Sequence, residues 1–277
     1  MYYIRGKTDK RHYTMKTTLA LLLSFITLTS VSQDFGKLCS EGIRHITGKN
    51  YEKAKKVFMD ATQACSNDKE KAYSHANLAY SLQMCGELEA ALKNYNIAIG
   101  IEGKEVALIL QRANIYTQLD STEKALLDYN TILEKEPFNT GALYTRAGIH
   151  ARTGNYRAAR EDYNTLLSID PENTNVHLGY AMLYQREKKY NECLMLLGQL
   201  IEDNPGNAIL YIARSDVQRE LGCYELALMD IEKAIGIDPG NANYYKLQAI
   251  LLEKSGKKEA AARSRRNATL IESGMKR

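Results

Sequence analysis

The residue types that carry out chemistry in enzymes are present in this 277-residue chain, but their spacing fits no known catalytic or metal-binding motif. There is no Cys-x-x-Cys, no His-Glu-x-x-His and no glycine-rich phosphate loop. The five histidines and five cysteines are scattered: His12, His45, His75, His150 and His177, and Cys39, Cys65, Cys85, Cys193 and Cys223. We therefore predict no catalytic residues, no cofactor and no metal site.

Arginine and aspartate recur together at a fixed separation. The arginine precedes the aspartate by sixteen residues in three pairs: Arg112 with Asp128, Arg146 with Asp162, and Arg214 with Asp230. Successive arginines are 34 or 68 residues apart. The other positions on this interval lack both residues, namely Leu78 with Asn94, Tyr180 with Leu196, and Gln248 with Ser264, and so does the pair Glu41 with Val57, 37 residues before Leu78. Because a partly buried arginine without its carboxylate is costly, we interpret the pairs as structural ion pairs.

The interval of 34 residues also governs the prolines, and it defines the elements that must position these side chains. The chain has four prolines, Pro137, Pro171, Pro205 and Pro239, which are evenly spaced. Three classes of residue recur at fixed distances before the prolines. Small residues recur at two distances, as Ala113, Ala147, Ala181 and Ser215 and as Ala125, Ala159, Cys193 and Ala227. Residues that start a second helix recur as Thr122, Tyr156, Tyr190 and Tyr224, and turn residues recur as Asp120, Gly154, Lys188 and Gly222. A period of 34 is typical of stacked pairs of helices.

One segment carries the pattern most completely. The residues from Leu143 to Pro171, LYTRAGIHARTGNYRAAREDYNTLLSIDP, resemble the tetratricopeptide repeat family. That motif runs aromatic, Leu, small, Tyr, then Ala, aromatic, Ala, Pro; the departures here are Arg146 and Leu166. The resemblance implies an all-α fold, a right-handed α-solenoid of about seven helix–turn–helix units.

The interval divides the chain into a leader and a run of units. We expect a basic leader and signal peptide over 1–32 and the solenoid over 35–275. The expected units are 35–68, 72–105, 106–139, 140–173, 174–207, 208–241 and 242–275, with residues 69–71 separating the first two. Because the units leave no room for a separate catalytic domain, we predict that the protein is not an enzyme.

The resemblance also implies where a partner binds, since first helices in this family line a concave face that holds a partner segment. Helical spacing then predicts the exposed groove residues: Tyr73, Tyr80, Asn114, Gln118, Tyr144, Arg152, Leu178, Met182, Arg186, Ile212 and Arg219. Arg152, Arg186 and Arg219 fall near the ends of their helices. Two interpretations stay open: they bind a partner's carboxylate, or they offset the helix C-terminal dipoles.

The N-terminal residues have the pattern of a secretory signal. Basic residues precede an apolar stretch from Leu19 to Val31, which ends in Ser30-Val31-Ser32, so we expect cleavage before Gln33. About thirteen apolar residues are too few to span a bilayer, which takes roughly 20. The alternatives are an uncleaved anchor and initiation at Met15. A secreted location permits a disulfide, and Cys39, Cys65 and Cys85 are its candidates.

Charge follows the same division. The leader holds five of the 37 basic residues and one of the 33 acidic ones, so the remainder carries 32 of each sign. A neutral remainder argues against nucleic-acid binding. We predict an extracytoplasmic scaffold that binds a protein or peptide partner and has no membrane span after cleavage. The alternative is an envelope-associated assembly factor anchored by the uncleaved apolar segment. The partner's identity, the oligomeric state and the pathway stay open.

Overall fold

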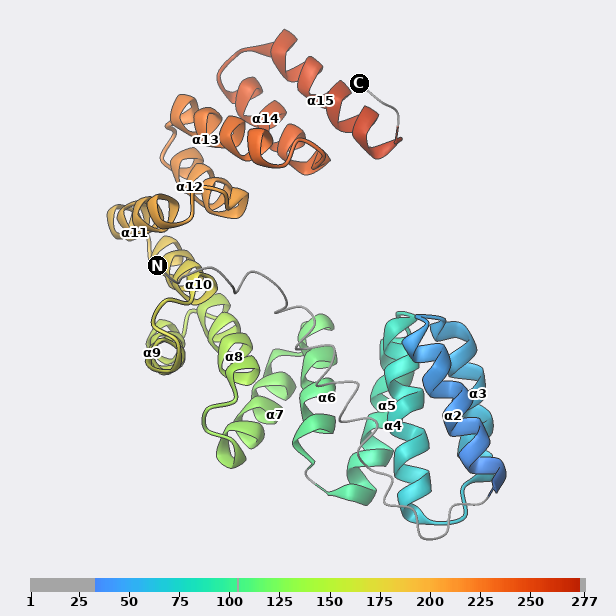
Figure 1. The fold of residues 1–277 in the computed structure, drawn as a ribbon. Helices are drawn as coiled ribbons and strands as arrows, with labels where there is room; N and C mark the ends of the chain where they lie inside the picture. Colours follow the sequence, from blue (N-terminus) through green and yellow to red (C-terminus); the bar gives the residue numbers. More distant parts are fainter. Residues whose placement is uncertain (1–32, 104, 275–277) are drawn as a thin grey trace, which may run out of the picture. The chain divides into compact units, whose positions relative to one another are not determined.

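The computed structural model describes residues 33–103 and 105–274 (Figure 1). These residues form fourteen α-helices and no strand: α2 (Gln33–Thr47), α3 (Tyr51–Ala64), α4 (Asp68–Met84), α5 (Leu88–Glu102), α6 (Val106–Gln118), α7 (Thr122–Lys135), α8 (Thr140–Arg152), α9 (Tyr156–Ile169), α10 (Thr174–Arg186), α11 (Tyr190–Asp203), α12 (Ala208–Glu220), α13 (Tyr224–Ile237), α14 (Ala242–Lys254) and α15 (Lys258–Glu272). The expected all-α fold is confirmed. Even-numbered helices are the first helices of seven pairs, and odd-numbered helices are the second.

The chain divides into two compact units, residues 1–142 and 143–277, and the boundary falls inside α8. In the first unit α2 packs on α3, α3 on α4, and so on in order to α7. In the second unit each helix from α10 to α15 likewise packs against the next one along the chain. Each unit is thus a row of helical hairpins in which every hairpin shares its apolar surface with its neighbours.

The prolines and the residues that start second helices set the helix boundaries. Helices α7, α9, α11 and α13 begin at Thr122, Tyr156, Tyr190 and Tyr224. Each ends two residues before one of the four prolines. Proline disfavours helical geometry in the residue before it and has no N–H to donate, so it prevents the helix from continuing. The interval read from the sequence is therefore the interval of the helix pairs.

Small residues lie where the two helices of a pair cross. Ala113, Ala147 and Ala181 on first helices are fully buried, and Ser215 at the next such position is nearly so. The second helices contribute Ala125, Ala159, Cys193 and Ala227, all inaccessible to solvent. Side chains this small let the helix axes approach closely, and a larger one would overpack the crossing.

The turn inside each pair requires a left-handed residue. Glycine supplies it at Gly86, Gly154, Gly222 and Gly256, where φ lies between 75° and 84°. Lys49, Asp120 and Lys188 occupy the same place in the other pairs, with φ of 57°, 53° and 60°. A side chain in this conformation brings Cβ close to the backbone, at a cost of roughly 1–2 kcal/mol. These three residues are therefore strained.

We expect Lys188→Gly to raise the free energy of unfolding by about 0.5–1 kcal/mol. Removing Cβ relieves the strain at φ 60°, and the greater freedom of glycine in the unfolded chain offsets part of that gain. Denaturant unfolding of the two proteins measures the difference. The matched control is Gly222→Ala, which is expected to destabilise; a Lys188→Gly variant less stable than the parent would contradict the strain.

The start of α4 departs from the expected unit boundaries. Residues 69–71, expected to separate the first two units, lie within the first turn of α4. The Asn67 side chain accepts a hydrogen bond from the Glu70 N–H at 3.0 Å, and the Glu70 carboxylate accepts one from the Ser66 N–H at 2.7 Å. The Asn67 N-cap and the Glu70 carboxylate thus satisfy N–H groups at the start of the helix, which begins earlier than the interval alone indicates.

Candidate partner-binding face

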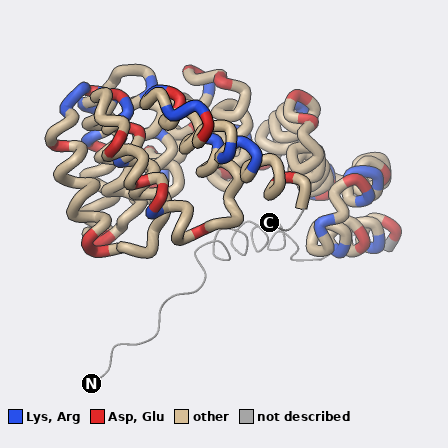
Figure 2. Tube along the Cα trace, turned by 90° about the horizontal axis from the view of Figure 1, so that it is seen from above, with Lys and Arg blue, Asp and Glu red and all other residues tan. Residues whose placement is uncertain are grey.

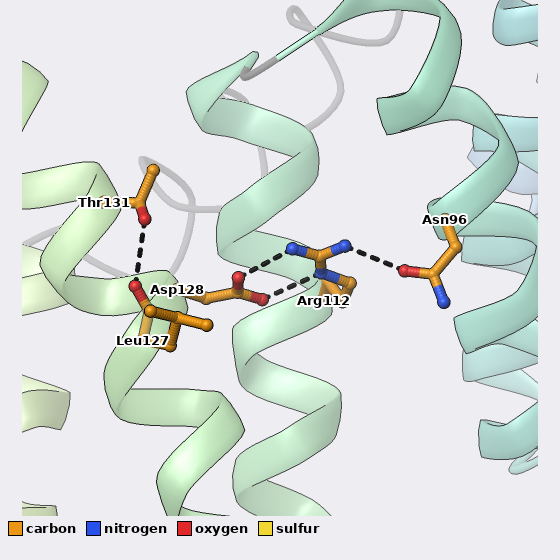
Figure 3. A network of polar contacts seen from close by, with 5 residues as sticks. All are labelled: Asn96, Arg112, Leu127, Asp128 and Thr131. Atoms are coloured by element: carbon orange, nitrogen blue, oxygen red, sulfur yellow. Dashed lines mark hydrogen bonds and ion pairs between the residues drawn. The ribbon is translucent and has the colours of Figure 1, made fainter.

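Ion pairs fix how the first helices sit against their second helices, and Figure 3 shows one of them. The Arg112 guanidinium of α6 donates to both oxygens of Asp128 on α7, at 2.8 and 2.7 Å. Its remaining terminal nitrogen donates to the Asn96 side chain of α5 at 2.8 Å (Figure 3). One arginine therefore joins three helices, and the bond to Asp128 raises the pKa of Arg112 above its usual value.

The same bidentate geometry recurs in the second unit, so the predicted pairing is confirmed. Arg146 donates to Asp162 at 2.9 and 2.6 Å, and Arg214 donates to Asp230 at 2.8 and 2.7 Å. Each aspartate is almost completely buried, whereas each arginine keeps about a quarter of its side chain exposed. These side chains are used in packing between the two helices of a pair.

The second unit exposes apolar side chains on successive first helices. Tyr144 on α8, Met182 on α10 and Ile209 on α12 are between 41% and 58% exposed. The three helices are neighbours, because the Tyr144 hydroxyl donates to the Asn175 carbonyl at 3.5 Å and the Gln185 amide donates to Glu220 at 2.9 Å. We call the exposed side chains of α8, α10 and α12 the first-helix face; its members are Tyr144, Arg152, Met182, Arg186, Ile209 and Arg219.

A stack of tyrosines supports this face from behind. The Tyr144 ring meets the buried Tyr163 ring edge-on, with centroids 6.2 Å apart, and Tyr163 contacts Tyr180 at 6.0 Å. Burial raises the pKa of Tyr163 to about 12, so its hydroxyl stays neutral. A Cβ at Gly179 would lie only 2.8 Å from the Tyr163 hydroxyl oxygen, so glycine at this position makes room for the ring.

Gly148 is an exposed position of the face that carries no side chain. A Cβ built on it would meet no heavy atom within 4 Å. It lies one turn after Tyr144 and one turn before Arg152 on α8, so the three residues share one side of the helix.

The three predicted arginines differ in their surroundings. Arg152 and Arg186 are both exposed. Arg219 donates to Asp216 on its own helix at 3.3 and 3.2 Å, so it is already engaged with a carboxylate. The Arg186 guanidinium has no hydrogen-bond acceptor and no carboxylate within 4.0 Å among the residues the structure describes. The basic residues are therefore not an even row of free cations.

The apolar groove residues Leu178 and Ile212 are half-buried. Leu178 packs against the cores around Leu200 and Leu197, and Ile212 packs against those around Leu210 and Ile231. Both side chains therefore pack between helices, whereas Met182 and Ile209 are exposed on the first-helix face.

In the first unit, the expectation that Tyr73 is an exposed groove residue is wrong. Its side chain is 9% exposed, because α4 contacts α2, α3, α5 and α6 and is enclosed on most sides. Tyr80 is half-buried against the Tyr51 ring, with centroids 6.4 Å apart. Asn114 is half-buried and accepts a hydrogen bond from Tyr129 at 2.8 Å, and only Gln118 is fully exposed. The predicted positions here serve mainly in packing.

Across residues 33–103 and 105–274, no three His, Cys, Asp or Glu side chains are grouped to hold a metal ion. None of the helices α2–α15 is both long and apolar enough to cross a membrane. The five cysteines are free thiols, and burial raises the pKa of Cys193 to about 11. Basic and acidic residues are interspersed along the helices (Figure 2).

Comparisons with known proteins agree with this architecture. Family models described as tetratricopeptide repeats match residues 110–174, 150–216 and 208–241. No curated protein sequence matches the chain. A solved tetratricopeptide repeat protein from Parabacteroides merdae is 28% identical, with a TM-score of 0.79 over 87% of this chain and 94% of that one.

Two more distant structures show the fold alone. Yeast Tom70 is 16% identical, with a TM-score of 0.68 over 94% of this chain and 60% of its own length. A thermophilic tetratricopeptide repeat protein from Thermus thermophilus is also 16% identical, with a TM-score of 0.54 over 66% of this chain and 99% of its own. The proline interval, the helical hairpins and these matches lead to one conclusion: the chain is a tetratricopeptide repeat protein.

Proposed function

We propose that the protein is a non-enzymatic scaffold that binds segments of partner proteins on the first-helix face of residues 143–277. The observation that carries this proposal is the exposure of Tyr144, Met182 and Ile209 on three neighbouring helices. Apolar side chains left on a surface that the fold does not need for stacking favour an interaction site. The half-buried side chains of Leu178 and Ile212 add apolar surface between these helices.

The double variant Met182→Asp/Ile209→Asp tests this proposal. Both side chains are about half exposed, so the charges are tolerated by the fold but oppose an apolar partner. We expect partner proteins captured from the native cells by the wild-type chain to be lost with the variant, at unchanged melting temperature. The matched control is Met195→Asp/Met229→Asp on α11 and α13, which are 65% and 61% exposed and lie off this face. Capture that is equal for all three proteins overturns the proposal.

We also propose that the protein is exported and that residues 1–32 are removed. The apolar stretch from Leu19 to Val31 and the Ser30-Val31-Ser32 site support export. Cleavage before Gln33 takes away none of the helices α2–α15, so the whole repeat array is retained. The intact mass of the protein isolated from its native cells tests this: we expect a chain beginning at Gln33, and a chain that retains residues 1–32 contradicts it.

A further inference from the structure

We propose that the α2–α3 hairpin is a detachable cover over α4. It separates from α4 as one cooperative segment, with residues 65–67 as the connection, while α4–α7 stay folded. Separation exposes Tyr73 and Asn77 of α4 to solvent. The proposal concerns the first unit alone and does not depend on the binding face assigned to residues 143–277. The side chains buried between this hairpin and α4 carry it, because they are polar where the other junctions between hairpins are apolar.

Two positions on each first helix pack against the second helix of the preceding hairpin. Leu108 and Ile115 of α6 share a core cluster with Tyr95 of α5, and Val217 of α12 shares one with Leu197 of α11. At intervals of 34 residues the two positions hold Ser74 and Ser81, Leu108 and Ile115, Ala142 and Ile149, Val176 and Leu183, Leu210 and Val217, and Tyr244 and Leu251. The two serines of α4 are fully buried. Serine adds little apolar area, so the junction with α3 gains less from hydrophobic burial than the later junctions do.

The polar groups at this junction bond within α4 rather than to the hairpin. The Ser74 hydroxyl donates to the Lys71 carbonyl at 3.0 Å, and the Ser81 hydroxyl donates to the Asn77 carbonyl at 2.9 Å. The Asn77 side-chain amide donates to the Tyr73 carbonyl at 2.9 Å. Separation of the hairpin therefore breaks none of these hydrogen bonds.

Other polar atoms on the same helix are buried without a partner. Glu70, Tyr73 and Asn77 follow one another at helical spacing and are at most 9% exposed. The Cys39 thiol of α2 is close enough to Glu70 and Tyr73 to interact electrostatically with both. Glu70 Oε1, the Tyr73 hydroxyl and Asn77 Oδ1 find no hydrogen-bond partner in the described part of the chain. A buried polar atom without a partner costs free energy, and this cost is removed when water reaches it, so opening is favoured at this junction.

Contacts that hold the hairpin to its neighbour lie near the surface. Lys55 of α3 pairs with Glu87, the residue before α5, at 2.6 Å, and the Tyr51 ring meets the Tyr80 ring edge-on. The Glu87 side chain is 46% exposed, so water screens the ion pair and its contribution is small. Repeat arrays are stabilised by the interfaces between neighbouring units, and a weak interface lets an end unit open on its own.

Hydrogen exchange of the purified full chain, followed by mass spectrometry, tests the proposal. The α14–α15 hairpin is the matched control, because it ends the described array on the other side but packs Leu251 against α13. We expect the amides of α2 and α3 to exchange about ten-fold or more faster than those of α14 and α15, because the α3–α4 junction is the weaker one. Equal exchange in the two hairpins would indicate only fraying of the array ends, and it overturns the proposal.

Asn77→Leu is the variant that closes the junction. Leucine removes the unpartnered Asn77 oxygen and adds apolar contact. We expect exchange in α2 and α3 to slow by about ten-fold, with α14 and α15 unchanged. A folded variant whose α2 and α3 exchange as fast as in wild type contradicts the role assigned to the buried polar groups.

Alkylation of the wild-type chain gives a second measurement that needs no variant. Cys39 and Cys193 are 3% and 1% exposed, and Cys193 lies on α11, which has hairpins on both sides. With iodoacetamide and peptide mapping, we expect Cys39 to react about ten-fold or more faster than Cys193. Its rate is also expected to depend less steeply on urea than global unfolding does, because opening one hairpin exposes less surface. Equal rates for the two thiols, or a urea dependence equal to that of global unfolding, overturn the proposal.

Discussion

Replacing Asp230 by leucine is expected to lower the free energy of unfolding by about 3 kcal/mol, because the partly buried Arg214 guanidinium loses its carboxylate. Removing one partner of a buried ion pair costs roughly 3–5 kcal/mol, and the lower end applies because 27% of the Arg214 side chain remains exposed to water. The protein then retains a desolvated cation that lies over the Tyr211 ring, with the guanidinium carbon 5.9 Å from the ring centroid.

The double variant Arg214→Leu/Asp230→Leu is expected to recover most of this loss. An apolar pair of similar size avoids the desolvation of both charges and is often as stable as the ion pair it replaces. The chain itself gives a precedent, since Tyr180 and Leu196 stand at the same two positions in the α10–α11 pair, and Leu196 packs into its core.

The four proteins of this cycle are compared by denaturant unfolding, with hydrogen exchange in α12 and α13 as a local measure. The local measure matters because repeat arrays unfold in segments, and the loss is expected to concentrate in this hairpin. If the double variant is as unstable as the sum of both single changes, the pair does not act as a unit and the interpretation is wrong.

The parts of the fold that were predictable from the sequence are those that follow from the properties of particular residue types. Proline ends a helix wherever it stands, so Pro137 and its three counterparts fixed the hairpin boundaries. Ala147 and Ala159 belong to sets of small residues that recur at a fixed interval, and a close crossing of two helices requires small residues at such positions. Arg146 and Asp162 vary together across the chain because neither is tolerated alone when buried.

The parts that were not predictable depend on neighbours that the interval does not reveal. Tyr73 occupies a groove position by spacing, but α4 is enclosed by the surrounding helices and buries it. Gln248 and Ser264 lack the ion pair, yet the Ser264 hydroxyl donates to the Gln248 side chain at 2.8 Å and links the same two positions of the hairpin. A neutral hydrogen bond has replaced the charges without changing the architecture.

The candidate face was predictable only in outline. Met182 and Arg186 were identified correctly as exposed residues on a first helix. Which arginine is free, however, depends on the rotamers of Asp216 and its neighbours, and such detail is not encoded in spacing. Whether a glycine faces open space, as Gly148 does, or an aromatic ring, as Gly179 does, depends on how the surrounding helices pack.

Adding a single methyl group at Gly179 is expected to destabilise the second unit by about 1–3 kcal/mol. A Cβ there lies 2.8 Å from the Tyr163 hydroxyl oxygen and 2.9 Å from two carbons of its ring, and this ring is buried and cannot swing into solvent. The same substitution at Gly148 meets no atom, so Gly148→Ala is expected to stabilise by about 0.5–1 kcal/mol through its better helix propensity. The two glycines thus form a matched pair on adjacent first helices.

The sign of each effect is read from denaturant unfolding of Gly179→Ala and Gly148→Ala beside the parent chain. Tyr163 also contacts the Tyr144 ring edge-on, so displacing Tyr163 at Gly179 also disturbs an exposed residue of the first-helix face. Gly179→Ala is therefore expected to weaken binding of a partner to the first-helix face even under conditions where the protein remains folded, although Gly179 itself is buried beneath the face. If Gly179→Ala proved as stable as Gly148→Ala, the tyrosine stack would not be close-packed, and the rigidity assigned to the binding face would have to come from elsewhere.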